Sequence, residues 1–298
     1  MKKWALIILF GLAAPPIWAE DEPNVMVFRY HAAESPTDQR DRYNWRVLAA
    51  VLERTRAAYG DYQLVPAKRQ AGFHQADGIL GGNDVRNVTV LAGWPDDTAD
   101  KVIGVRLPID RGLIGYRVLL IRDLDQPRFA RIENRRDLSR ISIGQLASWQ
   151  VARVLLADRM KVVTGESYEG LFKMLMTGRF DAFSRGAGEI GDEFDSHSAE
   201  YPGLAIEQTL LIHVPMAQYF WFPNDEEGRL HAERVRVGLQ VMIADGSLKA
   251  LFEEEFGERI RRLDMGRRLV IELPNPLQEP PEIDENSDLW FKLDEPLN

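Results

Sequence analysis

A cation stands at the end of a strand-like stretch in the middle of this sequence. Residues 179–186 read RFDAFSRG, with aromatic side chains alternating up to Arg185. If Arg185 faces a binding site, its guanidinium can form charge-assisted hydrogen bonds with an anion. The ligand would then be anionic at that end, or would carry no amine. The alternative is a surface ion pair with Glu189 or Asp192, which would add only about 0–1 kcal/mol to stability.

A helix start supplies a second group that could bind an anion. The stretch GQLASW, residues 144–149, comes just before a helical pattern. Backbone N–H groups at a helix N-terminus and a serine hydroxyl both suit a negative charge, so Ser148 is a candidate ligand-binding residue. Ser148 could also be a plain N-cap, and a cap that faces the ligand would do both. Tyr30, Trp94 and Trp149 could form an aromatic wall around the ligand, although aromatic residues more often belong to a core.

Other kinds of site find no support in the sequence. The five histidines show no metal-ligand spacing such as H-x-x-x-H. There is no G-x-S-x-G motif and no phosphate-binding Walker loop. The chain contains no cysteine, which excludes disulfides and thiolate chemistry. We therefore expect no enzyme, no metal and no cofactor.

The first 19 residues have the pattern of a secretory signal peptide. Lys2 and Lys3 precede an apolar run, two prolines break the run, and Ala19 follows at a position suited to cleavage. The run is shorter than the roughly 20 residues that a membrane-spanning helix needs, and no second run of that length follows. We expect cleavage after Ala19 and a soluble, exported protein, with an uncleaved anchor as the alternative.

The charge balance argues against one class of partner. The chain has 37 basic and 46 acidic residues, and the signal peptide removes two of the basic ones. Nucleic acid attracts proteins through basic side chains, so a nucleic-acid partner is not expected. A chain of 298 residues is long enough to bury a core without disulfides.

The pattern after the signal peptide is that of an α/β protein. The succession of strand, helix and strand at residues 25–66 predicts a βαβ unit with parallel strands, and a second such unit begins near residue 141. The last helix is expected to end at Gly257, a residue type that tolerates a left-handed cap. Strands are expected at residues 25–30, 62–66, 88–92, 102–109, 116–121, 141–144, 161–163, 180–184, 204–206 and 218–222, and helices at 43–59, 149–158, 168–177, 226–244 and 248–256.

Four local patterns in this order resemble a known family. Residues 107–121 resemble a strand pair that leads through a hinge, and residues 144–149 resemble a strand-to-helix turn that holds a ligand carboxylate. Residues 178–182, GRFDA, match a "G-x-x-D-A" strand, and residues 242–248, MIADGSL, match a closing "DG-x-L" helix pair. Together, over residues 24–265, the chain resembles the type II periplasmic solute-binding proteins of family 3, which serve amino-acid ABC transporters.

The resemblance implies a fold and a division of the chain. The fold would be an α/β, two-lobe clamshell with mixed, mostly parallel sheets and two hinge crossovers. Lobe 1 would comprise residues 24–115 plus 218–265, and lobe 2 residues 116–217. A proline-rich, acidic C-terminal tail would follow at residues 266–298. The ligand would lie in the cleft between the lobes, which close by a hinge motion.

The chain departs from that family at two positions. Family members clamp the ligand carboxylate with an arginine before the first hinge, but residues 94–101 contain no arginine. Members that bind amino acids also place an acid four or five residues after the aspartate of "D-A", where this chain has Arg185 and Gly186. A cation thus replaces the acid that would meet an ammonium group, which again favours an anionic ligand.

Arg111 and Arg117 lie near the expected first hinge and complete the set of candidate ligand-binding residues. Arg117 interrupts an apolar strand, and a charge buried in a strand is costly unless it is paired. Its partner could be the ligand, or an acid such as Glu189 in an internal salt bridge.

The resemblance implies a periplasmic solute-binding protein that captures a small anionic ligand for an ABC-type transporter. Its partners would be that ligand and a membrane permease, and the protein would be a monomer. The same fold could instead serve as a sensor or accessory subunit that signals to a membrane protein. A third alternative, an enzyme resembling the cyclohexadienyl dehydratases, would need a general acid, for which Glu34 and Glu189 are the candidates.

Overall fold

The computed structural model describes residues 25–32, 40–67, 86–93, 100–277, 284 and 287–296. The expected signal peptide and Trp94 lie outside these residues. Across the described part of the chain, none of the helices combines the length and the apolar character that a membrane crossing requires.

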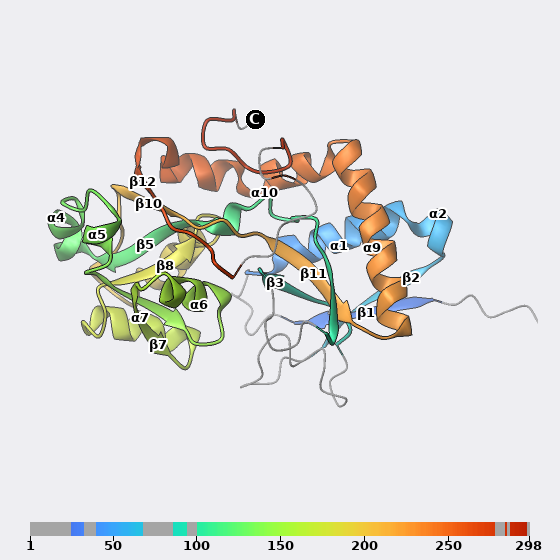
Figure 1. Cartoon of the computed structure of the whole chain (residues 1–298), viewed down its shortest axis with the longest axis horizontal. Helices are drawn as coiled ribbons and strands as arrows, with labels where there is room; N and C mark the ends of the chain where they lie inside the picture. The colour runs from blue at the N-terminus through green and yellow to red at the C-terminus, as the bar shows by residue number, and fades with distance from the viewer. Residues whose placement is uncertain are drawn as a thin grey trace, which may run out of the picture.

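The first lobe contains two small sheets and the longest helices (Figure 1). β1 and β2 pair in parallel around α1, which confirms the predicted βαβ unit. β11 lies between β3 and β4 and runs antiparallel to both. The elements are β1 (Met26–His31), α1 (Arg42–Arg54), α2 (Arg56–Tyr59), β2 (Tyr62–Ala67), β3 (Thr89–Ala92), β4 (Val102–Val105), β11 (Gln218–Pro223), α9 (Glu226–Ala244) and α10 (Ser247–Leu263).

The second lobe is built on a seven-stranded mixed sheet in the order β12-β10-β5-β8-β6-β7, with β9 beside β5. β6 is parallel to β7 and β8, β10 is parallel to β12, and β5 is antiparallel to its neighbours. The elements are η1 (Leu113–Gly115), β5 (Tyr116–Arg122), η2 (Asp123–Asp125), α4 (Gln126–Phe129), α5 (Arg135–Leu138), β6 (Ser142–Leu146), α6 (Gln150–Ala157), β7 (Lys161–Gly165), α7 (Tyr168–Met176), β8 (Ala182–Gly186), α8 (Ile190–His197), β9 (Leu204–Ile206), β10 (Leu210–His213), η3 (Met265–Arg267) and β12 (Leu269–Glu272).

The chain crosses between the lobes at residues 106–115 and returns at residues 214–217, and a third connection leads from α10 to β12. One buried carboxylate ties the first two crossovers together. Asp110 is 2% exposed. Its Oδ1 accepts the N–H of Gln218 at 2.9 Å, and its Oδ2 accepts the N–H of Ile114 at 2.9 Å. Burial raises the pKa of Asp110 to about 6, although these N–H groups oppose the rise. The two crossovers therefore form one hydrogen-bonded unit.

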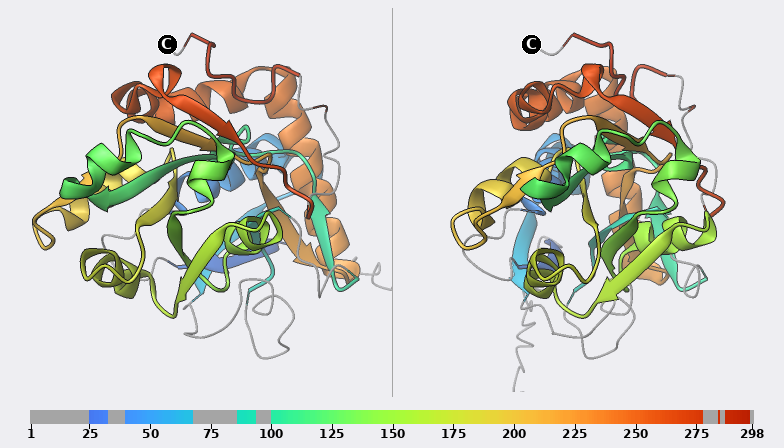
Figure 2. Two further views of the ribbon diagram at one scale, coloured as in Figure 1. Left: turned by 60° about the vertical axis from the view of Figure 1, so that its left-hand side comes forward. Right: turned by 90° about the vertical axis from the view of Figure 1, so that its left-hand side faces the viewer.

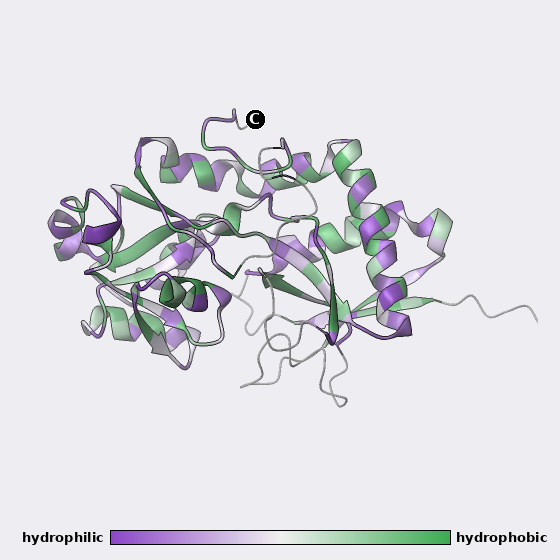
Figure 3. Cartoon of the chain, in the orientation of Figure 1, coloured by the Kyte–Doolittle hydropathy of each residue, from purple (hydrophilic) through white to green (hydrophobic). Residues whose placement is uncertain are grey.

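Hydrophobic residues are concentrated in the strands, as the colouring of β3 shows, whereas α4 and α5 are mostly hydrophilic (Figure 3). The core leaves no room at some glycines. A Cβ at Gly144 on β6 would collide with the ring of Phe180, which is itself 1% exposed. The apolar side chains on both sides of this strand explain why the second predicted βαβ unit forms.

Several expected elements have different ends. The last helix was predicted to end at Gly257, but α10 continues to Leu263 because Ile260 and Leu263 extend its buried face. The strand predicted at residues 102–109 ends at Val105. Five elements, α4, α5, α8, β10 and β12, are not predicted by the local sequence patterns. The residue boundaries of the two lobes remain a prediction. β12, which lies in the expected C-terminal tail, adds a strand to the sheet of the second lobe.

α10 runs along both lobes (Figures 1 and 2). Its residue Arg259 donates to the carbonyl of Gly188 at 3.2 Å and pairs with Asp192 at 2.8 Å, both in the second lobe. On its other side, Glu255 of α10 accepts hydrogen bonds from Arg42 and Arg46 of α1. α10 therefore contacts both lobes.

The sheets and helices of the two lobes confirm the predicted two-lobe α/β fold with mixed sheets.

Candidate functional site

Two parallel strands of the second lobe end side by side and carry polar side chains at their ends. β6 and β8 pair in parallel, with Gly144 opposite Phe183. Gln145 on β6, and Ser184 with Arg185 on β8, therefore lie at the same edge of the sheet. Ligands of α/β sheets bind outside the carboxyl ends of such strands, so this edge is the candidate site.

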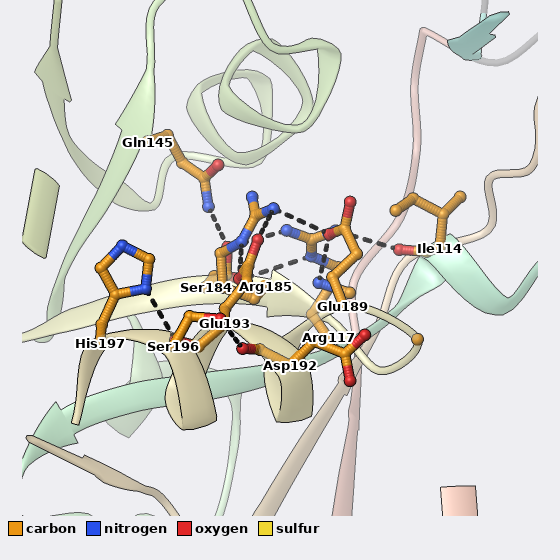
Figure 4. A network of polar contacts seen from close by, with 12 residues as sticks. Ile114, Arg117, Gln145, Ser184, Arg185, Glu189, Asp192, Glu193, Ser196 and His197 are labelled. Atoms are coloured by element: carbon orange, nitrogen blue, oxygen red, sulfur yellow. Dashed lines mark hydrogen bonds and ion pairs between the residues drawn. The ribbon is translucent and has the colours of Figure 1, made fainter. Parts of the chain in front are cut away.

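Arg185 is 2% exposed and forms a two-pronged ion pair inside the protein (Figure 4). Its Nε donates to Oε2 of Glu193 at 2.6 Å, and a terminal nitrogen donates to Oε1 of the same carboxylate at 2.5 Å. That nitrogen also lies 3.1 Å from Oε2 of Glu189. Burial works to lower the pKa of Arg185, but the two carboxylates outweigh it and raise the pKa. The alternative considered from the sequence was a surface ion pair of Arg185 with Glu189 or Asp192. Arg185 does pair with Glu189, but the pair is not on the surface, Glu193 is the closer partner, and Asp192 pairs with Arg259 instead.

Three aromatic rings surround this guanidinium. The central carbon of Arg185 lies 4.4 Å from the ring centroid of Trp149, 5.3 Å from that of Phe183 and 5.7 Å from that of Tyr168. Trp149 and Phe183 are stacked at 6.2 Å. Cation–π attraction therefore fixes Trp149 next to Arg185. Arg40 of the first lobe lies 4.7 Å from the centroid of Tyr168, so the two lobes meet at this ring.

Arg117 reaches the same edge from β5 and is also 2% exposed. It donates to the carbonyl of Ser184 at 2.8 Å, to the hydroxyl of Ser184 at 3.3 Å and to the carbonyl of Ile114 at 3.2 Å. Burial lowers the pKa of Arg117 to about 10, and Glu189 opposes this change. Arg117 forms no salt bridge with any described residue, so neutral oxygens take the place of the internal salt bridge considered from the sequence.

Gln145 is fully buried and shares an acceptor with Arg117, the carbonyl of Ser184. Its Nε2 donates to the carbonyl of Ser184 at 2.9 Å (Figure 4). Its Oε1 has no hydrogen-bond partner among the described residues. Buried polar atoms are nearly always paired, so this oxygen is an acceptor that a ligand or water could satisfy.

The N-terminus of α6 lies beside this edge. The helix begins at Gln150 with Trp149 as its N-cap, and the Trp149 side chain makes no cap hydrogen bond. Ser148, one residue earlier, is exposed. A Cβ at Gly93, which follows β3 of the first lobe, would lie 3.3 Å from Cγ of Gln150. The N-terminus of α6, which carries the partial positive charge of a helix start, therefore lies close to the boundary between the lobes.

The structure brings together four of the seven predicted site residues. Arg117, Ser148, Trp149 and Arg185 belong to the edge just described. Tyr30 lies on β1 in the first lobe, where its ring packs on Trp45 at 4.7 Å. Trp94 lies outside the described residues.

Arg111, the remaining predicted site residue, lies at the first crossover and contacts the C-terminal segment. Each of its three guanidinium nitrogens has a partner in residues 288–295. A ligand contact of Arg111 would therefore require these partners to move.

Sequence reasoning missed Gln145, Tyr168 and Glu193. Gln145 stands as a polar residue inside an apolar strand, a signal that could have identified it. Glu193 follows Glu189 by four residues, a spacing that puts both on one helix face once α8 is known. Tyr168 opens a helix whose apolar face is clear, and nothing local distinguishes it.

Among the described residues there is no group of three or more histidine, aspartate or glutamate side chains placed to hold a metal ion. The charged groups of the candidate site are two arginines and two glutamates, which compensate each other. The arrangement is suited to binding rather than to proton transfer.

No family model and no curated protein matches the chain. Solved structures do. The ligand-binding core of GluR0 from Nostoc punctiforme, in complex with L-glutamate, is 14% identical, with a TM-score of 0.50, and covers 78% of this chain and 99% of its own. A structure of the glutathione import system of Streptococcus mutans, which involves GshT and the cystine importer TcyBC, is 13% identical, with a TM-score of 0.55, and covers 79% of this chain and 96% of its own.

A third similar structure is a periplasmic His/Glu/Gln/Arg/opine family-binding protein from Silicibacter pomeroyi, in complex with lysine. It is 11% identical, with a TM-score of 0.53, and covers 78% of this chain and 98% of its own. At these identities the likeness concerns the fold. The predicted resemblance is confirmed at that level: the chain has the two-lobe fold of the type II periplasmic solute-binding proteins.

Proposed function

We propose that this chain is a periplasmic solute-binding protein, which captures a small anionic ligand between its two lobes for an ABC-type transporter in the membrane. Three observations support the proposal: the two-lobe fold, the signal-peptide pattern that ends at Ala19, and the polar edge at the ends of β6 and β8. The predicted partners are the ligand and a membrane permease.

The observation that carries the proposal is the N-terminus of α6. Its N-cap residue, Trp149, contributes no side-chain hydrogen bond to the backbone N–H donors of the first turn, and Ser148 is exposed next to them. A helix N-terminus carries a partial positive charge, so a carboxylate is the group that best fits these donors.

The charges around this helix start favour an anion over an amine. Arg117 and Arg185 lie beside Glu189 and Glu193, so these four groups have no net charge. Both carboxylates interact with arginine, and neither is free to bind a ligand ammonium group. The helix terminus is then the main electrostatic feature that a ligand meets.

In this proposal each predicted residue has a role. Ser148 and the first turn of α6 bind the ligand carboxylate, and Trp149 packs against its apolar part. Tyr30, with Trp94, would cover the ligand from the first lobe. Arg117 and Arg185 hold Ser184 and Trp149 in place, and a direct contact of either arginine with the ligand remains a prediction.

A thermal-shift screen of residues 20–298 tests the proposal. The panel contains amine-free carboxylic acids, dicarboxylates and ordinary amino acids. A ligand at 100 times its Kd stabilises the folded state by about 2.7 kcal/mol, which raises the Tm by several degrees. Stabilisation by amine-free acids supports the proposal. Stabilisation by amino acids alone contradicts the anionic preference, and no stabilisation across the panel contradicts small-molecule capture.

Ser148→Ala then tests the site itself. A hydrogen bond to a charged group contributes about 1.5–3 kcal/mol, so the variant should bind the acid found in the screen roughly 10- to 150-fold more weakly by calorimetry. Ser139→Ala is a matched control, because Ser139 precedes β6 whereas Ser148 follows it, and the Ser139 hydroxyl donates to the carbonyl of Arg136. Equal affinities of the two variants would place the ligand elsewhere.

A sensor is the second candidate function, favoured by the likeness to the GluR0 ligand-binding core. The binding chemistry would be the same, and only the membrane partner would differ. Cross-linking of the tagged protein in its native membrane, followed by identification of the linked protein, distinguishes a permease from a receptor or kinase. An enzyme has less support, because Glu189 is engaged with the N–H of Gly186 and with Arg185, and the other candidate acid, Glu34, lies outside the described residues.

A further inference from the structure

The C-terminal segment, residues 287–296, returns to the body of the protein and binds the first crossover. Figure 1 and both views of Figure 2 show it on the same side as α10. The N–H of Phe291 donates to the carbonyl of Arg111 at 2.7 Å. Arg111 has φ 54° and the next residue, Gly112, has φ 77°. The segment therefore binds the backbone where two consecutive residues are left-handed.

The Arg111 side chain is enclosed by the same segment. It is 1% exposed, and its nitrogens donate to the carbonyls of Asp288 at 3.0 Å and Leu289 at 3.1 Å. Two more bonds, at 2.5 and 2.9 Å, reach the two oxygens of the Glu295 carboxylate. A forked ion pair of this kind fixes both partners in direction as well as distance.

Apolar contacts extend the attachment to both sides of the crossover. The ring of Trp290 lies over Gly112, where a Cβ would be 2.5 Å from Cε3. Phe291 packs edge-on against Tyr116, at the start of β5, with 5.4 Å between ring centroids. It also lies 5.9 Å from Phe252 of α10. One short segment thus contacts the crossover, the second lobe and the long helix of the first lobe.

We propose that residues 287–296 act as a clasp that limits the motion of the two lobes. Hinge motion between lobes takes place by φ and ψ changes at a few crossover residues. A non-glycine residue in the left-handed region persists only where its surroundings hold it there. At Arg111 those surroundings are the clasp, which holds the backbone through Phe291 and the side chain through Glu295. This inference concerns the hinge and stands independently of the ligand.

Hydrogen exchange of the whole mature protein, followed by mass spectrometry, tests the clasp. Glu295→Gln removes the ion pair while it keeps the size of the side chain. The expected result is exchange at least tenfold faster in peptides that cover residues 106–118 and 214–218, with β6 and β8 unchanged. Glu254→Gln is the matched control, since it removes an exposed ion pair with Arg46 that involves no crossover residue.

Three results would overturn the proposal: faster exchange confined to residues 287–296, equally faster exchange throughout the chain, or no change at all. A second measurement reports the motion directly. The natural chain has no cysteine, so Ala57→Cys and Ala130→Cys give one exposed dye site in each lobe. Single-molecule energy transfer should show a broader distribution of distances for a chain that ends at residue 286. An unchanged distribution contradicts a clasp.

Discussion

The ion pair between Arg185 and Glu193 gives the sharpest test of the site geometry. Arg185→Met would remove the cation and leave the carboxylate of Glu193, a residue 6% exposed, without its partner. Breaking one side of a buried ion pair costs about 3–5 kcal/mol. We expect at least the lower end of this range, about 3 kcal/mol. In a chain of this size, that corresponds to a fall in Tm of roughly 6–12 °C.

The double variant Arg185→Met, Glu193→Leu separates pairing from packing. An apolar pair of similar volume is often as stable as the buried ion pair that it replaces, so the double variant should recover most of the lost stability. The assay is urea unfolding followed by circular dichroism and tryptophan fluorescence. Arg128→Met is the control, since its pair with Asp181 is largely exposed and should contribute about 0–1 kcal/mol. A loss below about 1 kcal/mol for Arg185→Met, or a double variant no more stable than the single one, would refute the buried pairing.

Two further substitutions test the crossover and the core. The folded state raises the pKa of Asp110 from 3.8 to about 6, so its contribution to stability is present at low pH and is lost as pH rises to about 6. Asp110→Asn should therefore remove a fall of about 3 kcal/mol between roughly pH 4 and 6 from the pH profile of unfolding, and an unchanged profile contradicts this assignment. Gly144→Ala should cost about 1–3 kcal/mol in urea unfolding because its Cβ meets Phe180, whereas Gly191→Ala, in a helix with open space around it, should be neutral or stabilising; equal effects would contradict the packing.

Much of the fold could be predicted because the apolar periodicity is local. The helix at Glu226–Ala244 was predicted with its observed ends, and the strand at residues 116–121 is one residue shorter than β5. The predicted end of the last helix was wrong, because long-range packing determines where that helix ends. Gly257 is a plausible helix end by itself, but burial of Ile260 and Leu263 outweighs the cost of about 1 kcal/mol for a glycine inside a helix.

The local sequence patterns predict which segments carry the candidate site, but they do not predict which side chains contact each other there. The end of β8 and the start of α6 were found from local patterns, and the structure places both at one edge. The partner of Arg185 was not found, because the short helix α8 has no strong apolar pattern and its Glu193 could not be placed. Arg111 illustrates the same limit, since its partners are about 180 residues away in the chain and no local signal joins them.

The contacts of Arg185 change how its position can select a ligand. A free arginine would attract an anion directly, and its charge would be exposed to the ligand. Here Glu193 and Glu189 neutralise the charge of Arg185. In the proposed function, the preference for an anion comes from the N-terminus of α6, and Arg185 occupies the two carboxylates that a ligand amine would need. This selection requires Arg185 to remain paired with Glu193 and Glu189. The same three side chains would therefore determine both the stability of the buried ion pair and the choice of ligand.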